Sequence, residues 1–201
     1  MNLLLATGNT GKLSEIIALL QDLPLELVTP AMLGISHNIP ELGNTYQENA
    51  ALKAQAYAKA SGLLTLADDS GLEVDALDGA PGLHSARFSP KPSASDADRR
   101  ALMLHKLQGH PPPWTARFRC VVALAAPHGA IHFAEGTCPG EIIPVERGQF
   151  GFGYDPLFLV GTTNHTMAEL PMEEKNQLSH RALAIKAIRP LLIELYLSPT
   201  P

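Results

Sequence analysis

Two neighbouring aspartates, Asp68 and Asp69, follow an apolar run that has the pattern of a buried strand. Asp68-Asp69-Ser70-Gly71 directly follows a short apolar run that ends at Ala67. If that run is a buried strand that stops at Asp68, ligands would bind beyond its carboxyl end, as in open α/β sheets. Adjacent strand residues point in opposite directions, so we expect one aspartate to hold a hard cation and the other to activate water. A solvated turn is the competing interpretation.

A second candidate site is the turn between the apolar run at residues 3–6 and a helical pattern that begins near Leu13. The turn consists of Thr7, Gly8, Asn9, Thr10, Gly11 and Lys12. Glycines let a ligand approach the backbone, helix N-terminal amides attract anions, and a lysine adds a point charge. The turn is shorter than a Walker A loop and lacks its magnesium-binding Ser/Thr. It therefore indicates either a phosphate site or a tight structural turn.

Further polar residues lie on either side of a predicted helix start. Thr45 and Glu48 form a capping-box pattern, in which each side chain satisfies a backbone amide of the other. Asn49 and Lys53 then share one helix face. Glu41 lies in the polar loop before this helix. Taken alone, Lys53 and Glu41 are more often solvated surface residues.

An aromatic segment bounded by glycines forms a fourth constellation. It contains Phe152, Gly153, Tyr154 and Asp155. Rings of this kind stack on flat bases, while backbone groups read the base edge. A glycine turn with core aromatics is an equally good interpretation.

The last constellation lies at the start of a C-terminal helical pattern. Lys175, His180 and Arg181 supply donors, Arg181 as a planar fork. A charged helix start is the alternative. Neither an HExxH pattern nor a GxSxG elbow occurs in the sequence, which disfavours zinc hydrolysis and serine nucleophile chemistry.

These candidates must be positioned by alternating strands and helices. We predict strands over residues 3–6, 25–28, 63–67, 117–124 and 130–135, and helices over about 13–24, 45–62, 95–107 and 174–196. Residues 80–92 read as an irregular surface loop, and the proline-rich residues 109–113 mark the candidate lobe boundary. The order of the elements indicates an α/β protein.

Composition narrows the class of protein. The chain has 201 residues, a net charge of −5, 45% hydrophobic residues and two cysteines. Such a chain forms one ordinary domain without a disulfide or thiolate zinc framework. The acidic balance argues against nucleic acid as a partner, and no apolar run approaches the roughly 20 residues of a membrane span. We expect a cytoplasmic protein.

The order of the motifs is more specific than any one of them. Together they resemble the Ham1/RdgB family of inosine triphosphate pyrophosphatases, and the resemblance spans nearly the whole chain. The matching segments lie within residues 6–12, 48–54, 67–72, 79–87, 151–156 and 174–181.

The resemblance implies a two-lobed single domain over residues 1–201, around a long mixed β-sheet flanked by helices. It further implies a homodimer that uses Mg²⁺ to hydrolyse ITP, dITP and XTP to the monophosphate and pyrophosphate. By motif, Asp69 and Lys53 would be catalytic, with Asp69 as the base or the activator of a metal-bound water. Asp68, Asp69 and Glu41 would hold Mg²⁺, and residues 7–12 would hold the triphosphate with Lys53 assisting. Ser70 would touch substrate. The residues around the base would be Phe152, Gly153, Tyr154, Asp155, Lys175, His180 and Arg181.

Two other functions compete with this one. A pyrophosphatase for other modified nucleotides would differ only in its substrate panel. A nucleotide-binding sensor would bind without releasing pyrophosphate, although activated water beside Asp68 and Asp69 would serve no purpose in a sensor.

Overall fold

The computed structural model describes residues 2–36, 39–127 and 129–197. The strands are β1 (Asn2–Leu5), β2 (Glu26–Val28), β3 (Leu64–Val74), β4 (Trp114–Ala125), β5 (Ile131–Ile142) and β6 (Phe158–Val160). The α-helices are α1 (Thr10–Leu20), α2 (Tyr46–Ser61), α3 (Asp96–Leu107), α4 (Met172–Leu178) and α5 (His180–Leu197). Short 3-10 helices are η1 (Ala31–Leu33), η2 (Asp75–Leu77), η3 (Gly82–Arg87) and η4 (Asp155–Leu157).

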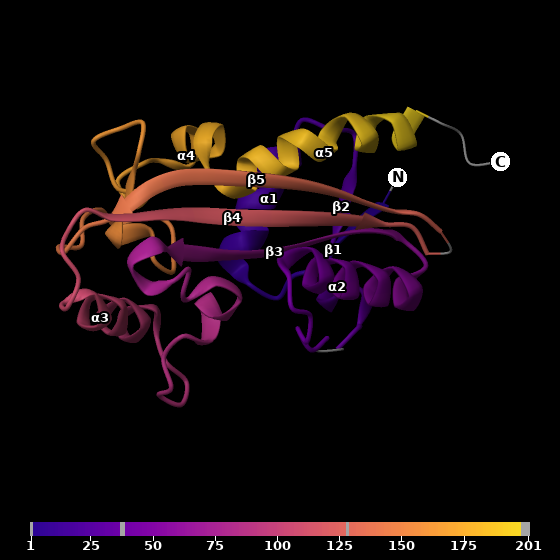
Figure 1. Cartoon of the computed structure of the whole chain (residues 1–201). Helices are drawn as coiled ribbons and strands as arrows, with labels where there is room; N and C mark the ends of the chain where they lie inside the picture. The colour runs from indigo at the N-terminus through magenta and orange to yellow at the C-terminus, as the bar shows by residue number, and fades with distance from the viewer. Residues whose placement is uncertain (1, 37–38, 128, 198–201) are drawn as a thin grey trace. The chain divides into compact units, whose positions relative to one another are not determined.

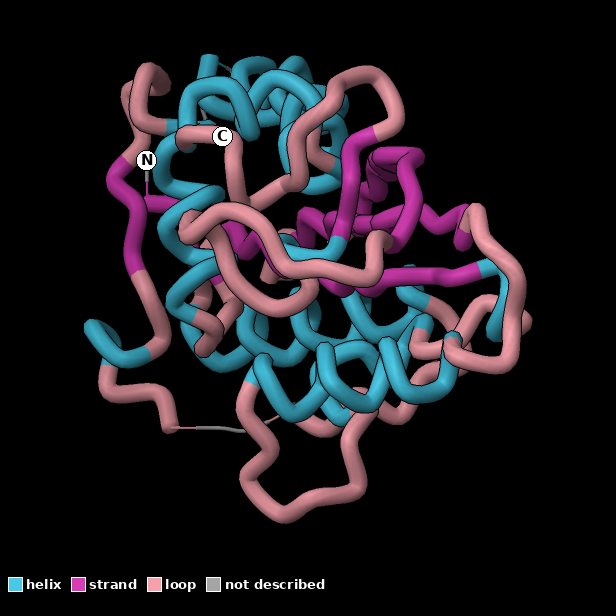
Figure 2. Tube along the Cα trace, turned by 90° about the vertical axis from the view of Figure 1, so that its left-hand side faces the viewer, coloured by secondary structure: helices cyan, strands magenta, loops and turns pink. Residues whose placement is uncertain are grey.

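The strands form one mixed sheet in the order β2-β1-β3-β4-β5-β6. Strand β1 runs parallel to β2 and β3, whereas β6 runs antiparallel to β5. Helical segments lie on both sides of the strands (Figure 2). The prediction of an α/β fold with a mixed sheet flanked by helices is thus confirmed.

The chain divides into two compact units. Unit 1 consists of Met1–Asp69, Cys120–Gly136 and Arg181–Pro201, and unit 2 of Ser70–Arg119 and Thr137–His180. The divisions fall inside the long strands β3, β4 and β5 and at the start of α5. Residues 109–113, the candidate lobe boundary, lie inside unit 2, because the chain passes between the units along strands and not through a proline-rich connector.

In unit 1, α5 lies on one side of the strands and α2 on the other (Figure 1), and α1 packs in the same apolar cluster as α5. Ile16 and Leu20 of α1 join Ile185 of α5 and Leu5 and Leu66 of the sheet in one apolar cluster. Helix α2 instead buries Ala50, Ala54 and Ala58, which recur every four residues on one face. Because alanine is small, this face lies close to the strands, and it carries Asn49 and Lys53 with it.

In unit 2, the strands lie between α3 and α4 (Figure 1). Met103 and Leu107 of α3 are fully buried in a second cluster with Phe118 and Phe158, whose ring centroids are 4.5 Å apart. This packing fixes α3 against the sheet.

Several boundaries differ from the predictions. Strand β3 does not stop at Asp68 but runs on to Val74, so both aspartates lie within a strand and not beyond its end. The C-terminal helical pattern is two helices, because Ser179 has an extended backbone (φ −67°, ψ 152°). Residues 80–92 include the 3-10 helix η3, and β6 was not predicted.

The capping box at Thr45 forms only in part. Thr45 Oγ1 accepts the Glu48 amide at 3.1 Å as predicted. The Glu48 carboxylate, however, accepts the amide of Asn44 at 2.6 Å, one residue before the predicted one. Among the described residues, no helix is long and apolar enough to cross a membrane.

Candidate active site

The turn after β1 is held by its own side chains. Thr7 Oγ1 accepts the Asn9 amide at 3.2 Å, and Asn9 Oδ1 caps α1 by accepting the Lys12 amide at 3.0 Å. Residues 7–12 therefore form one strand–turn–helix connection with a helix N-terminus at its centre. Such a terminus favours an anion.

Asp68 is a buried carboxylate surrounded by cations. Its Oδ2 lies 3.0 Å from Lys12 Nζ and accepts a hydrogen bond from Arg181 Nε at 3.2 Å. Arg181 also forms an ion pair with Glu15. The side chains of Asp68, Glu15 and Arg181 are each at most 3% exposed. Asp68 Oδ1 is buried and has no hydrogen-bond partner among the described residues.

Asp69 has different partners from its neighbour. Its Oδ2 accepts a hydrogen bond from Asn49 Nδ2 at 2.9 Å, and its Oδ1 lies 3.9 Å from Lys53 Nζ. Lys53 Nζ also donates to Glu41 Oε1 at 2.6 Å, so the ammonium bridges the two carboxylates. We call the whole group the carboxylate cluster; its members are Glu41, Asp68, Asp69, Lys12, Lys53 and Arg181.

The pKa values of the two aspartates are shifted in opposite directions. Burial alone would raise the pKa of Asp68, but Lys12 and Arg181 hold it well below its usual range. Burial raises the pKa of Asp69 above its usual range, because Lys53 and Lys12 offset only part of the lost solvation. Asp68 is thus a permanent anion, whereas Asp69 has the stronger affinity for a proton.

The donor chemistry of this cluster suits Mg²⁺. Magnesium prefers oxygen ligands and is usually held by one or two carboxylates, substrate phosphates and several waters. Asp68 Oδ1, buried without a hydrogen bond, is an oxygen of the required kind. Within the described part of the chain, no three His, Cys, Asp or Glu side chains are grouped as a metal site. Lys53 lies between Glu41 and Asp69.

Residues 150–155, which we call the glycine loop, belong to unit 2. Gly151 and Gly153 have φ values of +72° and +63°, which L side chains rarely adopt. Asp155 closes the loop: its Oδ2 accepts the Phe152 amide at 2.9 Å and Lys175 Nζ at 2.5 Å. Lys175 Nζ also lies 5.3 Å from the centroid of the Phe152 ring.

His180 lies in the same unit and packs face to face with an aromatic ring. Its imidazole stacks on Phe118 with centroids 4.7 Å apart and planes tilted by only 13°. The side chain is buried, and the next residue along α5, Arg181, belongs to unit 1.

The structure sorts the predicted site residues into two groups. Unit 1 brings together residues 7–12, Glu41, Lys53, Asp68, Asp69 and Arg181; unit 2 holds Ser70, residues 152–155, Lys175 and His180. Ser70 is half-buried and follows Asp69 in β3. Arg181 was expected beside the base; its guanidinium lies against Asp68 and Glu15, and its role toward the base stays a prediction.

Two residues that contact the carboxylate cluster, Asn49 and Glu15, were not predicted. Asn49 was noted only as a helix-face neighbour of Lys53, yet it is 1% exposed and donates to Asp69. A polar residue on a face otherwise made of alanines was the available signal. Glu15 gave no signal, because a single glutamate in an amphipathic helix normally faces water.

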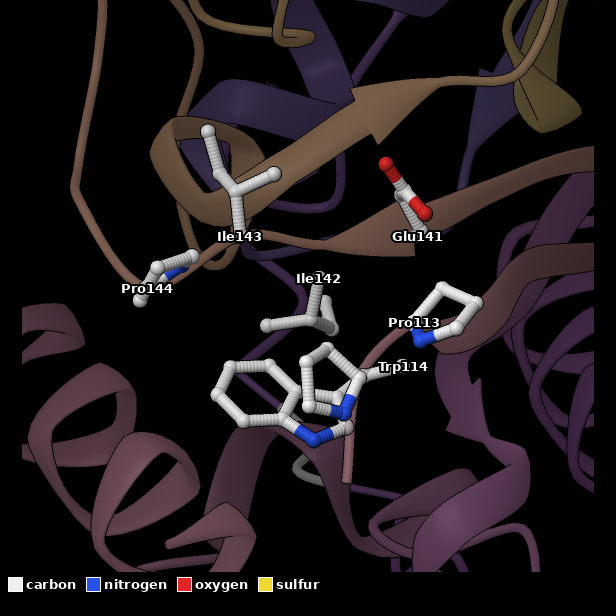
Figure 3. A pocket seen from close by; sticks show the side chains of 7 residues that line it. Pro113, Trp114, Glu141, Ile142, Ile143 and Pro144 are labelled. Atoms are coloured by element: carbon white, nitrogen blue, oxygen red, sulfur yellow. The ribbon is translucent and has the colours of Figure 1, made fainter. Parts of the chain in front are cut away.

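Unit 2 also contains an apolar pocket that includes none of the predicted residues. Its volume is about 410 Å³, and Figure 3 shows the side chains that line it. It is lined by Pro112, Pro113, Trp114, Glu141, Ile142, Ile143 and Pro144.

The fold and this site define the class: an α/β protein with a mixed sheet, in which a capped strand–turn–helix connection lies beside paired carboxylates and lysines. The Ham1 family model matches residues 3–191, and the chain belongs to this family.

Relatives cover almost the whole chain. It is 48% identical over 198 residues to a dITP/XTP pyrophosphatase of Desulforamulus reducens, covering 98% of each chain. It is 46% identical to a dITP/XTP pyrophosphatase of Geobacter sulfurreducens, covering 93% of this chain and 94% of the relative.

Solved structures agree with the family assignment. A HAM1 protein from Coxiella burnetii superposes with a TM-score of 0.87 at 40% identity, covering 96% of this chain and 99% of that one. The Staphylococcus aureus Ham1 protein gives a TM-score of 0.85 at 36% identity, covering 97% and 100%.

Proposed function

We propose that the chain is a nucleoside triphosphate pyrophosphatase that hydrolyses the non-standard purine nucleotides dITP, XTP and ITP to the monophosphate and pyrophosphate. The observation that carries this proposal is the pair of adjacent aspartates with opposed protonation behaviour, next to a helix N-terminus and two lysines. Near-full-length identity to dITP/XTP pyrophosphatases supports the same reaction.

The phosphate end of the substrate belongs with unit 1. A triphosphate carries about four negative charges, which the chain's net charge of −5 would repel without a local offset. Lys12, Lys53 and the first-turn amides of α1 supply that offset.

Water attack at the α-phosphorus breaks the bond to the bridging oxygen, and pyrophosphate leaves. Asp69 accepts the proton of the attacking water, and its raised pKa brings it nearer to the working pH than an ordinary aspartate. Mg²⁺, held by Asp68, Asp69 and Glu41, would supply charge stabilisation for the leaving pyrophosphate.

The residues expected around the base lie in unit 2, except Arg181, which belongs to unit 1. Hypoxanthine and xanthine carry an oxygen at C6, where adenine carries an amino group. A fixed hydrogen-bond donor pairs with that oxygen but is left without an acceptor beside the amino group. One buried unpaired group costs about 1–3 kcal/mol, and two such mismatches give a hundredfold preference or more. Lys175, His180 and Arg181 are the candidate donors, while Phe152 offers a ring for stacking.

We further propose that the enzyme acts as a homodimer in the cytoplasm. The dimer is expected from the family resemblance, and the cytoplasmic location from the composition of the sequence. Sedimentation of the purified chain at micromolar concentration tests the dimer directly.

A substrate panel tests the activity. Purified protein with Mg²⁺ is incubated separately with dITP, ITP, XTP, ATP and GTP, and both pyrophosphate and orthophosphate are assayed. We expect pyrophosphate from the first three substrates only. The C6 oxygen separates them from ATP, whereas guanine shares that oxygen, so rejection of GTP must involve its 2-position. Release from all five would contradict the account of base selection, and binding without release would instead support a sensor.

A further inference from the structure

The glycine loop is held by a helix that no motif singled out. Gly153 donates its backbone amide to Asp96 Oδ2 at 2.8 Å, and its carbonyl accepts a hydrogen bond from Arg100 at 2.8 Å. Asp96 and Arg100 are one turn apart on α3, so they occupy one helix face. Both polar groups of a single residue are therefore bound by one face of a packed helix.

This double contact fixes the backbone on both sides of the Gly153 Cα. Gly153 has a φ of +63°, although nothing lies within 4 Å of where a Cβ would be. The glycine is thus required by its backbone angles and not by crowding, and the two hydrogen bonds hold those angles. The neighbours on either side are Phe152 and Tyr154, and the directions of their side chains depend on the backbone angles of Gly153.

We call Asp96 and Arg100 the clamp, and both are firmly placed on α3. The Ser95–Asp98 capping box fixes the first turn of α3, which contains Asp96. Arg99 pairs with Asp96, and the Arg100 Nε donates to Glu146 at 2.9 Å. Met103 and Leu107 anchor the same helix in the core of unit 2.

The clamp also limits how the base can be read. The amides of Phe152, Gly153 and Asp155 donate to Asp155, Asp96 and the Phe152 carbonyl, respectively. Their role is to shape the loop, and reading of the base edge falls to side chains.

We propose that Asp96 and Arg100 are positioning residues that hold the glycine loop in the geometry required for nucleobase binding. The proposal rests on the proposed function, since it assigns the loop to the base of that substrate. It concerns the affinity for the base and not the phosphate chemistry of unit 1.

The test compares Asp96→Ala with Asp96→Asn and Arg100→Ala with Arg100→Lys. Asparagine keeps an acceptor oxygen for the Gly153 amide, and lysine keeps one donor for its carbonyl. Lys91→Ala is the matched control, because it removes an exposed ion pair to Asp98 at the same end of α3 without touching the loop.

Four quantities are measured: the hydrogen-exchange rate of the Gly153 amide by NMR, KM for dITP, kcat for dITP, and the inhibition constant of pyrophosphate. In Asp96→Ala and Arg100→Ala we expect KM to rise about tenfold, as for loss of one hydrogen bond to a charged group, with kcat within about threefold. In Asp96→Ala, Gly153 exchange also rises at least about tenfold. The pyrophosphate constant stays unchanged, and Asn or Lys restores most of the loss.

Unchanged Gly153 exchange in Asp96→Ala, or KM and kcat that fail together without rescue, would overturn the proposal. The proposed function fails separately, if the wild-type chain releases no pyrophosphate from dITP, ITP or XTP. In that case the dissociation constant of dIMP replaces KM, because it needs no turnover. A wild-type chain that also fails to bind dIMP overturns both.

Discussion

The carboxylate cluster and the glycine loop satisfy their polar groups in opposite ways. In the cluster, Asp68 leaves one buried oxygen without a hydrogen bond, and Asp69 is destabilised as an anion. In the loop, the amides of Phe152 and Gly153 both donate to carboxylates, and Lys175 neutralises Asp155.

The difference shows that the two regions have different requirements. The carboxylate cluster needs groups that can change their charge, whereas the glycine loop needs a fixed conformation. A group that exchanges protons or binds a cation must keep capacity that the fold does not use. A surface that selects a flat base must instead be preorganised, because every adjustment on binding lowers affinity. The predictions below test the two regions against each other, from the largest expected effect to the smallest.

Asp69→Asn should abolish most turnover with little loss of binding. Without a proton acceptor, we expect kcat for dITP to fall by about 10²–10⁴-fold, the usual contribution of a general base, while KM changes modestly. Steady-state kinetics measure both. Asp75→Asn, which alters a half-exposed surface ion pair, is the control, and near-normal turnover in Asp69→Asn would remove Asp69 from this role.

The same variant should make the free protein more stable at neutral pH. Because the folded-state pKa of Asp69 is raised, the ionised side chain destabilises the fold above that pKa, and this penalty disappears as the pH falls below the unfolded value of about 3.8. Urea unfolding in EDTA should therefore show Asp69→Asn more stable than wild type at pH 8 but not at pH 3. An advantage that persists at pH 3 would contradict the assignment.

Arg181→Ala should cost more stability than any change in the glycine loop. It leaves Asp68 and Glu15 as buried carboxylates with fewer cations, and breaking such a pair typically costs about 3–5 kcal/mol. Denaturant unfolding measures this, with the exposed ion pair of Arg189 (Arg189→Ala) as control. If Arg181 also reads the base, the activity ratio of ITP to ATP falls; equal proportional losses on both would contradict that role.

Asn49→Ala tests the support of Asp69. The side chain donates to Asp69 and accepts the Gly43 amide at 2.8 Å, so its loss removes a hydrogen bond from buried Asp69 and another from half-buried Gly43, at about 1–3 kcal/mol in total. We expect lower stability together with a lower kcat. Gln55→Ala, on the exposed face of α2, should change neither, and a stability loss with unaltered kcat would make Asn49 purely structural.

The sequence predicted the fold class and singled out most residues of the carboxylate cluster and the glycine loop, but it did not predict the environment of the aspartates. Alternation and capping patterns are local and identified β1, α1, α2 and α3 to within a few residues. The continuation of β3 through Asp68 was missed because local propensity makes Asp-Asp-Ser-Gly a turn. The strand continues because Lys12 and Arg181, distant in sequence, neutralise Asp68.

The missed clamp has a similar cause. Asp96 in the first turn of a helix looks like an ordinary N-terminal acid, and its hydrogen bond to Gly153 depends on tertiary packing alone. Long-range partners of this kind leave no periodic trace in one sequence.

Gly153→Ala, the smallest change, separates shape from stability. Gly62, the C-cap of α2, has a φ of +70° and, like Gly153 at +63°, has open space around its missing Cβ. Alanine at either position therefore costs about 1–2 kcal/mol through backbone strain alone. If the loop is preorganised for the base, only Gly153→Ala raises KM for dITP, and Gly62→Ala does not. Equal KM values at equal loss of stability would mean that the conformation of Gly153 serves folding and not recognition.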